Sequence, residues 1–310
     1  MAETAPPTST SAPAKEKAGA PPPAPKGGGT KPDVATLGGI VLALGGIVGG
    51  LLLEKGSIQD VAQATAAMIV FGGTIGAVLI TNPLPVFIGA CKALGQVFFE
   101  RTLSPAATIQ TVLQMATKAR KNGIVSLENE TENLSDPFLR KALNLAVDGT
   151  DLNELRKMME TDIELAEQSG EAEAKVWEAA GGYAPTIGII GAVMGLIQVM
   201  KHLDDIKEVG HGIAVAFVAT VYGVGSANIF FLPAGSKLRA RLHRARVIKE
   251  MALEGVAAIV EGLNPTLIRL KLEAFDQEKA PKPKAKEAQT SKAAESSAKS
   301  GSPQPASAGD

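Results

Sequence analysis

The stretch YAPTIGIIGAVMGLIQVMKHLDDIKEVGHGIAVAFVATVYGVGSANIFFL, residues Tyr183–Leu232, decides the fold of this chain. It holds two apolar runs, 183–200 and 210–232, which are joined by a short polar stretch and contain no acidic residue, lysine or arginine. Each run is about 20 residues long, the length that a helix needs to cross ~30 Å of hydrocarbon. The stretch therefore predicts a membrane hairpin.

Small residues recur at helical spacing along both runs. They are Gly188, Gly191, Ala192 and Gly195 in the first run and Gly212, Ala216, Thr220, Gly223 and Ala227 in the second. Small residues let two helix backbones approach closely, which is how helices pack in a bilayer whose lipid is as apolar as leucine. We therefore expect both runs to pack against other helices along these faces.

Two more apolar runs precede the hairpin, Val34–Leu53 and about Val61–Ile80. Residues Glu54–Ser57 form a predicted turn between them, and Asn82-Pro83 marks the end of the second run. A buried helical hairpin in a soluble core is the alternative interpretation, but four uncharged runs of this length are typical of a membrane protein. The runs therefore predict four transmembrane helices.

The rest of the chain is charged and helical in pattern. Residues 92–178 contain fifteen acids and ten bases, and their apolar residues recur every three or four positions. Gly123 and Gly149 are expected at helix ends. After the fourth run, residues 237–249 include six basic residues and no acid, and an amphipathic helical pattern continues to Phe275. The fold class predicted is an all-α integral membrane protein with a large helical cytoplasmic domain.

The chain therefore divides into six segments. They are a disordered Pro/Ala/Gly-rich arm (1–32), transmembrane helices 1 and 2 (33–91), a helical cytoplasmic loop (92–178), transmembrane helices 3 and 4 (179–233), a cytoplasmic helical segment (234–276) and a disordered Lys/Ala/Ser-rich tail (277–310). The arm and the tail lack the apolar residues that a packed core requires. Basic residues gather before the first run, after the second and after the fourth, so the positive-inside bias predicts cytoplasmic termini.

The composition argues against several function classes. A net charge of −1 and an aromatic content of 4% argue against nucleic acid as the main partner. The single cysteine, Cys91, cannot form an internal disulfide, and no Cys/His cluster has the spacing of metal ligands. No nucleophile–base pair, phosphate-binding loop or paired carboxylates can be identified, so we expect neither an enzyme nor a bound metal or cofactor.

The layout and several motifs resemble the A subunit of bacterial flagellar stators, the MotA/PomA family. The matching segments are PDVATLGGI (32–40), ARKNGIVSLE (119–128), LAVDGTD (145–151), YAPTIGIIGAVMGL (183–196), FVATVYGVGSANIFFLP (217–233) and EGLNPTLIRLKL (261–272). Their order, their spacing and the four-span topology all agree with that family. The two terminal arms lie outside the resemblance.

The resemblance implies a subunit of the bacterial inner membrane that couples inward ion flow to torque on the flagellar rotor. The family forms a pentamer around two copies of a peptidoglycan-anchored, single-span MotB/PomB subunit, whose aspartate carries the ion. Arg120 and Glu128 fall on the family's charged pair that engages the rotor protein FliG. Pro185 and Pro233 fall on two prolines, at the cytoplasmic ends of the third and fourth spans, that are associated with torque-linked conformational change.

The resemblance also bears on the coupling ion. In Na⁺-driven members, threonine hydroxyls from the third and fourth spans lie near the partner's aspartate. Here the fourth span keeps Thr220, but the third has Ala192, so each subunit supplies one oxygen donor fewer. A dehydrated sodium ion needs several oxygen ligands, whereas proton transfer needs a carboxylate and a water path. We therefore expect H⁺ rather than Na⁺ as the coupling ion.

Simpler interpretations of the same residues stay open at the level of sequence. Arg120 and Glu128 can be an ordinary solvated pair. Pro185 can sit in the first turn of a helix, and the hydroxyl of Thr220 can bond the carbonyl four residues before it. For the whole protein, the alternatives are a TolQ/ExbB-type energy transducer, which normally has three spans, a gliding or secretion motor, and a purely structural membrane scaffold.

Overall fold

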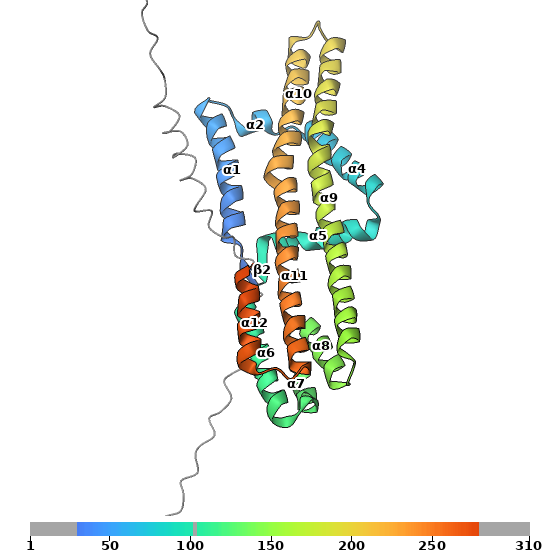
Figure 1. The fold of residues 1–310 in the computed structure, drawn as a ribbon. Coiled ribbons are helices and arrows are strands. Elements are labelled where there is room, and N and C mark those ends of the chain that lie inside the picture. Colours follow the sequence, from blue (N-terminus) through green and yellow to red (C-terminus); the bar gives the residue numbers. More distant parts are fainter. Residues whose placement is uncertain (1–29, 102–103, 279–310) are drawn as a thin grey trace, which may run out of the picture.

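The computed structural model describes residues 30–101 and 104–278, and this part of the chain is almost entirely helical (Figure 1). Four helical stretches are long and apolar enough to cross a membrane: Val34–Leu53, Ala64–Thr81, and parts of the helices Leu152–Lys201 and Ile206–Val260. The predicted all-α fold with four membrane helices is therefore confirmed. The arm up to residue 29 and the tail from residue 279, both predicted to be disordered, lie outside the described residues.

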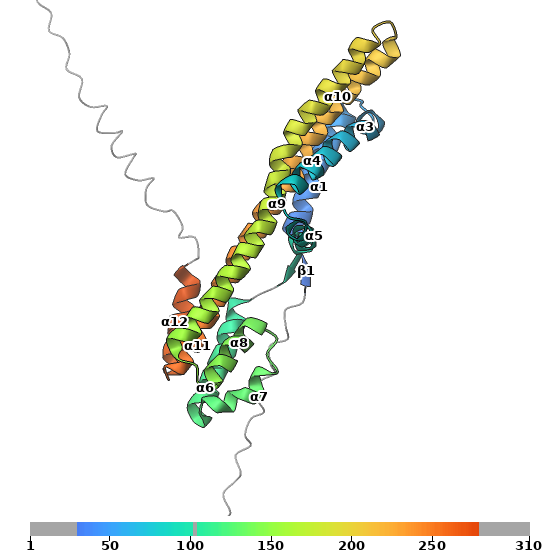
Figure 2. The same cartoon turned by 90° about the vertical axis from the view of Figure 1, so that its right-hand side faces the viewer.

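Two very long antiparallel helices form the spine of the molecule (Figures 1 and 2). The first, α9 (Leu152–Lys201), has 50 residues. The second has 55 residues and consists of α10 (Ile206–Ser226), a π-helical turn η3 (Ala227–Phe231) and α11 (Leu232–Val260). At 1.5 Å per residue the two long helices are about 75 and 83 Å long, far more than a bilayer requires. The boundaries placed at 178/179 and 233/234 from the sequence thus fall inside continuous helices, because packing along the spine carries both helices from the membrane part into its extension.

The second span is less regular than the sequence indicates. It was expected from Val61, but a short helix α2 (Ile58–Val61) ends there and the span begins at Ala64. It then comprises α3 (Ala64–Ala67), a π-helical turn η1 (Met68–Gly72) and α4 (Gly73–Thr81). At the break, around Ala62 and Gln63, the hydroxyl of Tyr222, on α10, donates a 2.6 Å hydrogen bond to the carbonyl of Val61.

The first span, α1 (Val34–Leu53), has little contact with its own subunit. None of its apolar window is buried, and its main neighbours are α5 (Leu84–Phe98) and η3. Helix α5 follows the second span after Pro83 and runs across the spine (Figure 1). Its buried residues, Ala90, Ala93 and Val97, pack on α9 and α11. These contacts place α5 at the end of the membrane part nearest the charged domain.

Two short strands correct the predicted arm. Strand β1 (Thr30–Pro32) pairs antiparallel with β2 (Phe99–Arg101), so that Pro32 lies opposite Phe99. The last three residues of the arm, expected to be disordered, are therefore ordered by the chain that leaves α5. This pairing depends on a segment almost 70 positions away and has no local signal in the sequence.

The charged domain packs around the far ends of the spine. It contains α6 (Pro105–Asn122), η2 (Ile124–Leu127), α7 (Glu128–Thr131), α8 (Pro137–Val147) and α12 (Pro265–Glu278). Gly123 and Gly149 end helices with φ angles of 83° and 77°, which confirms both predictions. The helix expected to continue to Phe275 instead stops at Val260, because Gly262 at φ 71° turns the chain back into α12.

Candidate functional site

Glycines bring the backbones of α9 and α10 into direct contact. A Cβ on Gly223 would lie 2.6 Å from the carbonyl oxygen of Ala184, and one on Gly195 would lie 2.7 Å from that of Gly212. A Cβ on Gly188 would lie 2.9 Å from the carbonyl oxygen of Ala219. No side chain fits at these positions, so the predicted close approach of the two runs is confirmed.

The two residues predicted for the ion path lie in this contact region. Thr220 is adjacent to Ala219 and half-buried, and its hydroxyl donates a 3.2 Å hydrogen bond to the carbonyl of Ala216. The local hydrogen bond considered from the sequence is thus present. It uses the hydroxyl proton and leaves the oxygen able to accept. Ala192 is half-buried, one helical turn beyond Gly188, and supplies no polar atom.

Pro185 lies deep inside α9 rather than in its first turn, which overturns the simpler interpretation of this residue. Proline has no N–H, so it cannot donate to the carbonyl of Gly181 as a regular helix would require. The hydroxyl of Thr186 donates a 2.8 Å hydrogen bond to the carbonyl of Tyr183 at the same turn. Pro185 therefore marks an interrupted point of the helix ladder.

Pro233 lies opposite this interruption. It is the second residue of α11 and directly follows the π-turn η3. A Cβ on Gly181 would lie 2.5 Å from the side chain of Leu232, the neighbour of Pro233. The structure thus brings the two predicted prolines into the same region of the spine, where α9 lacks the hydrogen bond that Pro185 cannot donate and the other long helix contains the π-turn η3. Such π-turns occur frequently at functional sites.

Aromatic side chains fill the space around the two irregular turns. The indole of Trp177, on α9, stacks on Phe231 with ring centres 6.1 Å apart and meets Phe230 edge-on at 6.0 Å. Its N–H donates a 3.1 Å hydrogen bond to the carbonyl of Ala90 on α5. Trp177 therefore contacts both α5 and the second long helix and stabilises the packing of α5 on the spine. The only signal for Trp177 in the sequence is that it is the single tryptophan of the chain.

The predicted rotor-binding residues lie at the opposite end of the molecule. Arg120 is exposed in the last turn of α6, and Glu128 is exposed in the first turn of α7. Neither makes an ion pair within residues 30–101 and 104–278. The positive charge of Arg120 lies at the C-terminus of α6 and the negative charge of Glu128 at the N-terminus of α7, and each position is favourable for interaction with the helix dipole. The buried Leu127 anchors the turn between them.

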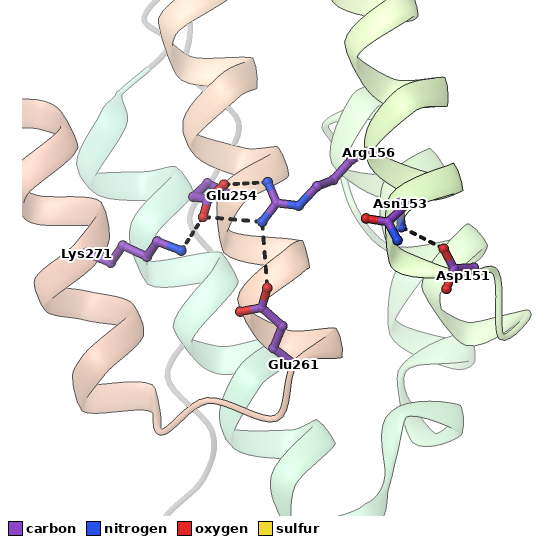
Figure 3. Close-up of polar contacts among 6 residues, drawn as sticks. All are labelled: Asp151, Asn153, Arg156, Glu254, Glu261 and Lys271. Carbon is purple, nitrogen blue, oxygen red and sulfur yellow. Dashed lines mark hydrogen bonds and ion pairs between the residues drawn. The ribbon is translucent and has the colours of Figure 1, made fainter.

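A network of charges ties the helices of this domain together (Figure 3). Arg156, on α9, donates a 2.8 Å hydrogen bond to Glu254 on α11 and lies 3.8 Å from Glu261. Lys271, on α12, pairs with the same Glu254. Hydrogen bonds from Arg156 and Lys271 lower the pKa of Glu254 to about 2. At the start of α9, Asp151 caps the helix through the backbone N–H of Asn153 at 2.9 Å.

Across the described residues, no group of three or more His, Cys, Asp or Glu side chains is arranged to hold a metal ion. The geometry instead combines a glycine-packed membrane hairpin, an interrupted level at two prolines and a distant charged surface. Such an arrangement can link events inside a membrane with a contact outside it.

Comparison with known sequences agrees with this arrangement. Residues 130–251 match the profile described as the MotA/TolQ/ExbB proton channel family, and residues 37–123 match the profile of the motility protein A N-terminal region. The chain belongs to the motility protein A family. It is 35% identical to motility protein A of Bacillus subtilis over 244 residues, which cover 77% of this chain and 89% of that protein. It is 34% identical to chemotaxis protein PomA of Vibrio alginolyticus over 236 residues, 76% of this chain and 92% of that one.

Solved structures of the family have the same fold. The C. jejuni MotAB structure matches with a TM-score of 0.75 at 31% identity, over 80% of this chain and 98% of that one. The flagellar MotAB stator complex from Bacillus subtilis matches with a TM-score of 0.73 at 33% identity, over 80% of this chain and 100% of that one. The resemblance drawn from the sequence motifs is therefore confirmed for the membrane spans and the charged domain alike.

Proposed function

We propose that this protein is the A subunit of a flagellar stator, which works with a single-span, MotB-like partner to couple ion flow to rotation. The observation that carries the proposal is its likeness to MotAB stator structures over 80% of the chain. Large apolar side chains are exposed on α1 and on the outer faces of α9 and α10, so these surfaces are available to lipid or to further helices in the membrane. We propose a pentamer of this chain around two copies of the partner.

The ion path lies between the α9–α10 contact and the partner's membrane carboxylate. This proposal is supported by the sequence: no acidic residue, lysine or arginine lies in any of the four apolar runs, so a charged carrier inside the membrane has to come from another chain. Thr220 offers one hydroxyl oxygen in this region and Ala192 offers none. We propose protons as the coupling ion, since this donor set is poor for sodium.

The rotor contact is proposed for the exposed pair Arg120 and Glu128, which would meet complementary charges on a FliG-like rotor protein. Unpaired exposed charges on rigid helix ends suit a transient contact, because they steer and register a partner without holding a fold together. Pro185 and Pro233 are proposed as the level at which the spine changes shape. The membrane is the bacterial inner membrane, with both termini on the cytoplasmic side.

The test is complementation of a motile host that lacks its own stator. We expect swimming when this chain is co-expressed with a MotB-like partner, and none with either alone. The double variant Arg120→Glu, Glu128→Lys should swim poorly while its complex still assembles, because neither residue supports the domain core. Lys118→Gln is the matched control, since it removes a charge of the same helix that is paired internally with Glu130. Full swimming by the charge-reversed variant would count against the rotor contact.

A further inference from the structure

Asp33 lies directly before the first span and makes several polar contacts. It caps α1 by accepting a 3.1 Å hydrogen bond from the backbone N–H of Thr36. Its other carboxylate oxygen lies 2.6 Å from the ammonium of Lys237 and 2.6 Å from the guanidinium of Arg241, both on α11. Only 8% of Asp33 is exposed. These three residues, which we call the Asp33 junction, join segments more than 200 positions apart.

The junction reaches a third segment through Arg241. Its guanidinium also donates a 2.9 Å hydrogen bond to the carbonyl of Phe99, in strand β2. The backbone N–H of Asp33 donates a 2.8 Å hydrogen bond to the carbonyl of Phe98. Strand β2 is the start of the connection from α5 to the charged domain. One guanidinium therefore holds the first span, the entry to the charged domain and the extension of the fourth span together.

Besides this junction, α1 is held mainly by the β1–β2 pairing directly before it and has few contacts along its length within the described residues. None of the span's apolar window is buried in the subunit. In Figure 1, α1 lies to the left of the spine and is separated from it. The position of α1 is thus fixed mainly at its N-terminal end. Because the carboxylate is buried, its attraction to the two cations is little screened by salt. Its pKa lies well below the usual range, chiefly because of the hydrogen bond from Lys237, so the junction stays charged at any physiological pH.

The junction lies close to the irregular level of the spine. Lys237 and Arg241 follow Pro233 by about one and two helical turns on an uninterrupted helix. A rotation of α11 at η3 and Pro233 must therefore carry both cations with it. They would pull Asp33, and with it α1, in the same movement.

We propose that the Asp33 junction is a mechanical link that transmits movement of the fourth-span helix to the first span and to the charged domain. Asp33, Lys237 and Arg241 are positioning residues, because they act through the helices they join. This inference rests on the proposed stator function. The neighbouring ion pair of Arg239 and Glu178, at 2.8 Å, differs from the junction because it links only α11 to α9, which already pack against each other.

The test compares Asp33→Asn with Glu178→Gln in the full stator complex. Asparagine is as good a helix cap as aspartate, so the change removes the charge and keeps the bond to Thr36. Glu178→Gln removes the partner of Arg239, two residues from Arg241 on the same helix. Two quantities are measured for each variant: the number of stator units recruited to a motor, by a fluorescent fusion, and the speed step that each unit adds to a heavily loaded bead.

For Asp33→Asn we expect near-normal recruitment and a several-fold smaller speed step, with a larger step restored by Asp33→Glu. Glu178→Gln should match the wild type in both. Failure of Asp33→Asn to assemble would show a purely structural role and overturn the link, and so would a speed step equal to that of the wild type. A wild-type chain that drives no rotation would contradict the proposed function itself, which separates the two failures.

Discussion

At the scale of single residues, Glu254 shows how one side chain holds several helices. It accepts hydrogen bonds from Arg156 and pairs with Lys271, so it joins α9, α11 and α12 at the base of the spine. Its side chain is only 21% exposed. Removing its charge leaves Arg156 and Lys271 close together, with Glu261, 3.8 Å from Arg156, as the remaining carboxylate of the network, which costs more than removing an isolated surface charge.

We expect Glu254→Gln to lower the free energy of unfolding of the charged domain by about 1–2 kcal/mol at neutral pH, between typical exposed and buried pairs. The pKa of Glu254 falls from 4.5 to about 2 on folding, so its contribution is complete above pH 4.5 and is lost as the pH falls toward 2. Thermal unfolding at neutral and at acid pH should show the difference between wild type and variant shrinking in acid. Glu132→Gln, at an exposed position, is the control, and a pH-independent difference would contradict the account.

The sequence predicted residue roles where the cause is local. The helix-ending glycines and the i−4 hydrogen bond of Thr220 follow from backbone chemistry within a few positions. It did not predict Asp33, Tyr222 or Trp177, whose long-range side-chain hydrogen bonds go to residues 87 or more positions away. Asp33 had one signal, since an aspartate directly before an apolar run is a favoured helix cap. Its two cations could not be assigned without the fold.

At the scale of elements, the contact between α9 and α10 depends on glycine. Gly223 faces the backbone of Ala184 and Gly188, and backbone atoms cannot rotate aside as a side chain can. The spans were predictable because hydropathy and length are read directly from sequence. The continuation of both helices through Pro185 and Pro233 was not, because packing along the spine overrides the local tendency of proline to end a helix.

We expect Gly223→Ala to push the two helices apart and destabilise the complex by ~1–3 kcal/mol, the usual cost of overpacking. The measurement is the thermal midpoint of the purified complex with its partner. Gly225→Ala is the matched control, because a Cβ on Gly225 has nothing within 4 Å in this subunit. Equal midpoints for Gly223→Ala and wild type would mean that the contact is looser than described.

At the scale of the whole molecule, the spine spans from one membrane surface to the far end of the charged domain. It therefore provides one continuous body between the proposed ion path and the proposed rotor contact (Figure 2). The four-span topology and the large charged domain followed from segregated apolar and basic residues. The faces through which subunits contact each other could not be predicted from the sequence. A membrane helix is apolar on the faces that contact lipid as well as on those that contact another subunit.

The predicted orientation can be tested by labelling with a membrane-impermeant thiol reagent in a Cys91→Ser background. Lys55→Cys and Asp205→Cys should be labelled from outside the inner membrane, and Asn122→Cys only after the membrane is opened. All three positions are exposed in the subunit, so access depends on the side of the membrane alone. Labelling of Asn122→Cys before Asp205→Cys would reverse the topology.

The most direct test of the central claim, that this chain turns ion flow into torque, is the rotation of single motors. A bead is attached to a flagellar stub in a host without stators, and this chain is induced with its MotB-like partner. The account predicts equal, stepwise increases in speed, little change when sodium is removed, and a stop when a protonophore collapses the proton gradient. A bead that stays still although the assembled complex is present in the membrane would contradict it.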